Sequence, residues 1–76
     1  MSKLTIISDR DMIRLLKSLG FVEIRQKGSH VFFAHPDSRV TVVPVHNEDL
    51  GRGLIRKILD DIDLTVAEYE RLRKNI

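Results

Sequence analysis

Apolar residues recur at helical spacing near the start of the chain. Four of them fall at i, i+3, i+4 and i+7 and so form one stripe along a helix. They are Met12, Leu15, Leu16 and Leu19. Ser8 is a suitable N-cap, and Gly20 supplies the left-handed residue that commonly ends a helix. The pattern predicts a helix over about Asp9–Leu19.

Between residues 21 and 44 the pattern changes to that of strands. Apolar and polar residues alternate over Phe21–Lys27, and apolar or β-branched residues dominate His30–His35 and Arg39–Pro44. Turn residues separate these segments at Gly28–Ser29 and at Pro36–Ser38. Because the connections are short, the sequence predicts a three-stranded antiparallel meander.

Helical spacing returns in the last third of the chain. Leu54, Ile55, Ile58 and Leu59 mark a helix over about Arg52–Asp60. Thr65 and Glu68 form the pattern of a capping box that opens a short further helix. The order predicts an α+β fold, α-β-β-β-α with a short extra C-terminal helix, which is the layout of double-stranded-RNA-binding folds.

Composition limits the possible classes of protein. A chain of 76 residues makes one domain with one small core, and its hydrophobic fraction of 42% is sufficient for folding. The absence of cysteine excludes disulfides and thiolate chemistry. No apolar stretch approaches the roughly 18 residues that span a bilayer. We therefore expect a cytoplasmic protein without membrane attachment.

Charge is unevenly distributed, although the net charge is only +2. Cations outnumber acids over residues 25–57, whereas every charged residue over 58–70 is acidic. The cations of the first region are Arg25, Lys27, Arg39, Arg52, Arg56 and Lys57. A basic middle beside an acidic segment predicts one face that attracts anions.

One histidine occupies a position that is suited to catalysis. His30 follows the Gly28–Ser29 turn and lies close to the cations Arg25 and Lys27. Imidazole is the side chain that accepts and releases a proton near neutral pH, and a glycine lets a ligand approach the backbone. The combination indicates a candidate catalytic residue in a basic hairpin.

Strand alternation bears on the direction of this histidine. If Val31 and Phe33 face the helices, His30 and Phe32 lie on the opposite face. This register keeps the ring in water and exposes Phe32 as a platform on which a nucleobase stacks. The opposite register buries His30 and exposes Phe33, and the pattern alone leaves both open.

Metal binding and nucleophilic catalysis by a side chain are disfavoured. His30, His35 and His46 lack the spacing of a metal site, and no cysteine completes a ligand set. We expect no metal and no cofactor, and we interpret His35, beside a turn, as structural. The sequence also lacks a nucleophile elbow and a phosphate-binding glycine loop.

RNA scission suits these residues, because RNA carries its own nucleophile in the ribose 2′-hydroxyl. His30 would serve as the acid or base, while Arg25 and Lys27 bind phosphate. The Ser29 hydroxyl is a further phosphate donor beside Gly28. His46 joins the site if the third strand pairs with the second.

The sequence resembles the HicA-type mRNA interferase toxins and the related YcfA-like proteins. Four segments in the family's order carry the resemblance, over residues 11–21, 25–30, 42–46 and 50–59. The resemblance extends from about Ser8 to Leu64. It implies a double-stranded-RNA-binding-like fold, metal-independent mRNA cleavage, an essential histidine at His30, and neutralisation by a HicB-type antitoxin.

These inferences give one HicA-like toxin domain over residues 1–76, in which residues 66–76 are a short extension expected to cap the core. The candidate RNA-binding residues are Arg25, Lys27, Gly28, Ser29, Phe32 and His46. Two alternatives stay open: a non-catalytic RNA-binding module of the same fold, and an inactive remnant that only binds protein. RNA sequence preference, oligomeric state and any second catalytic group are left undetermined.

Overall fold

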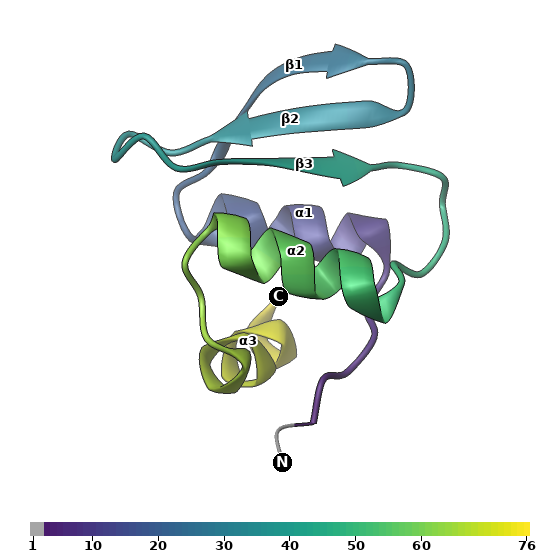
Figure 1. The fold of residues 1–76 in the computed structure, drawn as a ribbon, viewed down its shortest axis with the longest axis vertical. Coiled ribbons are helices and arrows are strands. Elements are labelled where there is room, and N and C mark those ends of the chain that lie inside the picture. Colours follow the sequence, from purple (N-terminus) through teal and green to yellow (C-terminus); the bar gives the residue numbers. More distant parts are fainter. Residues whose placement is uncertain (1–2) are drawn as a thin grey trace.

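The computed structural model describes residues 3–76. Its elements are α1 (Asp9–Ser18), β1 (Val22–Lys27), β2 (His30–Ala34), β3 (Val40–Pro44), α2 (Arg52–Asp61), α3 (Val66–Leu72) and a single 3₁₀ turn (Arg73–Asn75). The strands form one antiparallel sheet in the order β1-β2-β3 (Figure 1). The predicted α+β fold with an extra C-terminal helix is confirmed.

The predicted ends of α1 are present. The Ser8 hydroxyl accepts the backbone N–H of Asp11 at 3.1 Å, as an N-cap does. Beyond the helix, Gly20 adopts a φ of +96°. A Cβ atom there would also lie 3.1 Å from Nε2 of His35. Both the backbone conformation and the close neighbour therefore favour glycine at this position.

Buried and accessible side chains alternate along β2 and β3, which defines two faces of the sheet. The inner face consists of Val31, Phe33, Thr41 and Val43, all buried. The outer face consists of His30, Phe32, Ala34, Val40, Val42 and Pro44, all exposed or half-buried. The inner face joins the hydrophobic core, and the outer face meets solvent.

Strand β1 forms where the alternation predicted it, but none of its residues is buried. Its apolar members Val22 and Ile24 are 59% and 56% exposed. A bulge between Glu23 and Arg25 breaks its register with β2. No helix covers β1, because this strand lies at the edge of the sheet furthest from the helices (Figure 1). The strand widens the accessible surface instead of adding to the core.

The core lies between the inner face and the helices, and both α1 and α2 contact β3. Helix α3 lies beyond them, on the side away from the sheet (Figure 1). Its Tyr69 is fully buried in the core, and its hydroxyl donates to the carbonyl of Thr5. The capping box of Thr65 and Glu68 opens this helix as predicted. The C-terminal helix thus caps the core.

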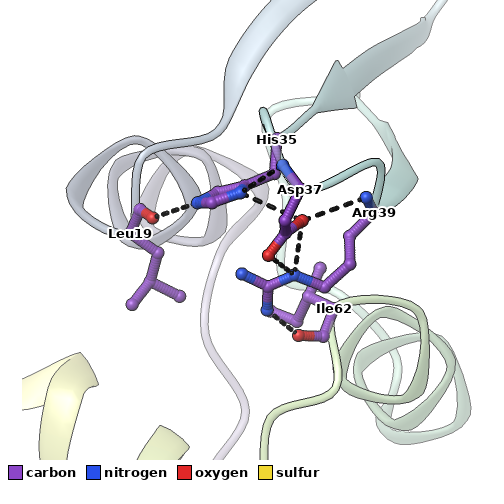
Figure 2. A network of polar contacts seen from close by, with 5 residues as sticks. All are labelled: Leu19, His35, Asp37, Arg39 and Ile62. Carbon is purple, nitrogen blue, oxygen red and sulfur yellow. Dashed lines mark hydrogen bonds and ion pairs between the residues drawn. The ribbon is translucent and has the colours of Figure 1, made fainter.

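A polar cluster fixes the end of the sheet where β2 turns into β3 (Figure 2). Nε2 of His35 lies 3.2 Å from the carbonyl oxygen of Leu19, just after α1. Arg39 donates to Asp37 at 2.8 Å and to the carbonyl of Ile62, just after α2. The hydrogen bond from Arg39 holds the pKa of Asp37 below its ordinary value. These contacts fit the structural interpretation of His35.

Candidate functional site

The hairpin between β1 and β2 sets the position of the candidate histidine. Lys27 pairs with His30, so Gly28 and Ser29 alone form the turn. Gly28 has a φ of +59°, which is the sign that a type II′ turn requires at its first central residue. The Gln26 side chain donates to the carbonyl of Gly28 at 3.1 Å. This turn places His30 at the first position of β2.

His30 is exposed on the outer face, in the register that keeps the ring in water. Its neighbours across the sheet are Lys27 on β1 and Pro44 on β3. Side chains of directly paired residues share a face, with Cβ atoms roughly 5 Å apart. An accessible histidine and an accessible lysine therefore lie side by side on the same face of the sheet.

The next row of the outer face holds Arg25, Phe32 and Val42, which are also paired across the sheet. The guanidinium carbon of Arg25 lies 4.6 Å from the centre of the Phe32 ring, a cation–π contact. The expectation of an exposed Phe32 is corrected, because this residue is half-buried and the guanidinium of Arg25 lies over its ring. A base would meet Arg25 and Phe32 as one stacked surface.

His46 reaches the same end of the sheet as His30. The pairing of β3 with β2 meets the condition for this, and the N–H of Val45 donates to the carbonyl of Ser29 at 2.7 Å. Asp9 then holds the following loop, because one of its oxygens accepts the N–H groups of His46 and Asn47 at 2.7 and 2.8 Å. The exposed His46 thus lies in a loop tied to both the hairpin and α1.

The role of Asp9 was not predicted from the sequence. In the sequence it is only the first residue of the predicted helix, yet it is 1% exposed, and its other oxygen accepts the N–H of Arg10 at 2.7 Å. Burial alone would raise the pKa of Asp9, but the backbone N–H groups of His46, Asn47 and Arg10 lower it below its ordinary value. An ionised carboxylate therefore positions the loop.

The structure brings the predicted residues to one surface. Arg25, Lys27, Gly28 and His30 are exposed, and Ser29 and Phe32 are half-buried beside them. Within residues 3–76, no group of three or more His, Cys, Asp and Glu is placed to hold a metal ion. No helix in this part of the chain is long and apolar enough to cross a membrane.

The fold and this surface define a class of small α+β domains with the double-stranded-RNA-binding-like layout and an exposed histidine in a basic hairpin. The family described as HicA toxin of bacterial toxin-antitoxin matches residues 10–64. The match covers more than half of the chain, so the chain belongs to this family and is a toxin that has an antitoxin partner. None of the curated proteins is similar enough to count as a relative. Helix α3 lies outside the matched range.

Proposed function

We propose that this toxin is an mRNA interferase, an endoribonuclease in which His30 is the general acid or base. The observation that carries the proposal is the exposed imidazole of His30 beside Lys27 on the outer face. Such a ring is open to substrate and ready to exchange a proton, and the neighbouring cation attracts phosphate. The family's toxin role supports the proposal, because loss of messages would stop translation.

The chemistry uses the ribose of the substrate as the nucleophile. The 2′-oxygen attacks the adjacent phosphorus, the bond from phosphorus to the 5′-oxygen breaks, and a 2′,3′-cyclic phosphate and a 5′-hydroxyl result. One proton leaves the 2′-oxygen and one is gained by the 5′-oxygen, and His30 exchanges one of these two. Positioned acid–base help of this kind is worth about 10²- to 10⁴-fold in rate.

The remaining residues of the hairpin bind the RNA. Lys27 and Arg25 place positive charge where the phosphate gains negative charge. Gly28 leaves room for the RNA backbone, and the hydroxyl of Ser29 donates to a phosphate oxygen. His46 adds a second imidazole at the same end of the sheet. The attacking group belongs to the ribose, so the proposed reaction needs no metal ion to activate a water molecule.

A cognate antitoxin of the HicB type would control the toxin by covering His30. The exposure of this ring supports the idea, because an open site is silenced most directly by physical occlusion. We place the toxin in the cytoplasm, where messages are translated. We treat residues 1–76 as one toxin domain with residues 66–76 as an extension.

The test replaces His30 and follows growth and RNA in cells. His30→Ala should abolish growth arrest and preserve RNA integrity, while the melting temperature stays within a few degrees because the side chain is exposed. Gln26→Ala is the control, because it removes a hairpin hydrogen bond and keeps the imidazole. Undiminished toxicity of His30→Ala would exclude the assigned role.

An assay with purified protein separates cleavage from binding alone. The toxin is incubated with labelled single-stranded RNA, with and without a chelator, beside His30→Ala. We expect cleavage products from the wild type under both conditions and none from the variant. RNA that is retained but never cut would identify a non-catalytic RNA-binding module instead.

A further inference from the structure

His30 and His46 differ from the third histidine of the chain in what their rings contact. In His35, Nε2 lies 3.2 Å from the carbonyl oxygen of Leu19, and Nδ1 accepts the backbone N–H of Asp37 at 3.1 Å (Figure 2). His30 and His46 are both exposed, and no group among residues 3–76 forms a hydrogen bond to either ring. Two imidazoles are therefore available to a ligand.

The pairing of β2 with β3 brings these two histidines close together. His30 pairs with Pro44, and the N–H of Val45 donates to the carbonyl of Ser29, which continues the same register by one residue. A paired position lies roughly 5 Å away across the strands, and two residues add roughly 7 Å along the strand. The Cα atoms of His30 and His46 are therefore about 8–9 Å apart. Two imidazole side chains can meet around one phosphate group across this gap.

The side chain of His46 belongs to the same face of the sheet as that of His30. Pro44 lies on the outer face, whereas Val45 is half-buried and packs against the core, as an inner-face residue does. Because side chains alternate along an extended chain, the pattern predicts that the side chain after Val45 returns to the outer face. Both histidines then flank the position at which the basic hairpin binds phosphate.

The backbone of His46 is fixed although its side chain is exposed. Its N–H and that of Asn47 donate to the buried carboxylate of Asp9 at 2.7 and 2.8 Å. The side chain of Asn47 also accepts from Arg10 at 3.1 Å. Ordering the backbone in advance reduces the entropic cost of placing a reacting group. An uncommitted ring on a fixed backbone is the arrangement expected of a residue that acts on a substrate.

We infer that His46 is the second acid–base residue of RNA cleavage, and this inference rests on the proposed function. As the 2′-oxygen bonds to phosphorus and the bond to the 5′-oxygen breaks, one proton leaves the first oxygen and one joins the second. These oxygens lie on opposite sides of the phosphorus in an in-line reaction, so one imidazole on each side performs both transfers. One ring begins neutral and the other protonated. Cleavage exchanges these states, and proton exchange with water restores them.

Replacement of His46 by glutamine tests this role, because glutamine keeps a polar side chain but exchanges no proton. At saturating RNA, purified His46→Gln should cleave labelled RNA about 10²- to 10⁴-fold more slowly than the wild type. Its affinity for RNA with methylated 2′-hydroxyls, which is not cleavable, should stay within about threefold, because only a transition-state interaction is lost. Retained affinity also shows that the variant is folded. Glu48→Gln is the matched control and should cleave at the wild-type rate, because this neighbouring residue is exposed and its side chain forms no hydrogen bond among residues 3–76.

A substrate with sulfur in place of the 5′-oxygen, at the site that the wild type cuts, separates the acid from the base. A thiolate leaves without gaining a proton, because a thiol is more acidic than an alcohol. This substrate should restore cleavage to within about tenfold of the wild type in one of the variants His30→Gln and His46→Gln, the one that lacks the acid. The variant that lacks the base should stay slow.

Three results would overturn the assignment of His46. They are an unchanged cleavage rate at saturation in His46→Gln, full activity of His46→Arg, and restoration of both variants or of neither by sulfur. The first two would leave His46 as a residue that only binds RNA. In each case, loss of cleavage in His30→Gln would still support the proposed function. A wild type that cuts no RNA would refute both.

Discussion

Replacement of Asp9 by asparagine tests how the loop that follows β3 is held. In the wild type, one oxygen of Asp9 accepts two N–H groups from this loop, and the other accepts the N–H of Arg10. Asparagine keeps one acceptor and puts an NH₂ donor in place of the second. Either Arg10 or the pair His46 and Asn47 then loses its partner in a site that is 1% exposed.

The expected cost follows from these contacts. A buried N–H left without an acceptor costs about 1–3 kcal/mol, and the lost charge at the N-terminus of α1 costs about 0.3–1 kcal/mol more. We expect Asp9→Asn to lower the free energy of unfolding by about 1–4 kcal/mol. A domain of this length has roughly 4–11 kcal/mol in total. The melting temperature should fall by roughly 5–30 °C.

Urea denaturation followed by circular dichroism measures this loss. Asp11→Asn is the matched control, because Asp11 lies in the same first turn of α1 but makes only a partly exposed ion pair with Arg14. The control should lose less than about 1 kcal/mol. Amide exchange at His46 and Asn47 should accelerate in Asp9→Asn alone. Equal losses of stability in the two variants would refute the assigned role of Asp9.

Two further predictions concern the fold. In thermal melts, Gly20→Ala should lower the free energy of unfolding by about 1–2 kcal/mol, because φ is +96° and the new methyl group meets His35. Gly53→Ala, which lies in open space within α2, should instead raise the free energy of unfolding by about 0.5–1 kcal/mol. Stability should also fall in acid. The N–H of Thr5 lowers the pKa of Glu70, and the pKa of Asp9 is lowered as well. Their contribution is complete above the ordinary values of 4.5 and 3.8 and disappears as pH falls through the lowered values. A urea midpoint that stays constant down to about pH 3 would contradict this.

Local patterns were sufficient for most of the fold. The spacing of the apolar residues and the Ser8 cap place α1 correctly, and the pattern of Thr65 and Glu68 places α3. Local alternation left two registers open for His30, and the one that keeps its ring in water is observed, because Val31 and Phe33 are the apolar pair that the helices cover.

Features that depend on distant residues were out of reach. Alternation in β1 predicts a strand but carries no information on whether a helix covers it, so the exposure of Val22 and Ile24 was not foreseen. The contact of Asp9 with His46 spans 37 residues. Asp61 was interpreted only as part of an acidic segment, since its meeting with Thr41 depends on how α2 packs against β3.

The N-terminal segment has its partners late in the chain. Thr5 accepts from Tyr69 and donates to Glu70, and the carbonyl of Leu4 accepts from Arg52 at 2.9 Å. During translation, Leu4 and Thr5 leave the ribosome before α3, and Thr5 must therefore wait for this helix before it completes its contacts. The N-terminal segment therefore completes its packing only after α3 has been synthesised.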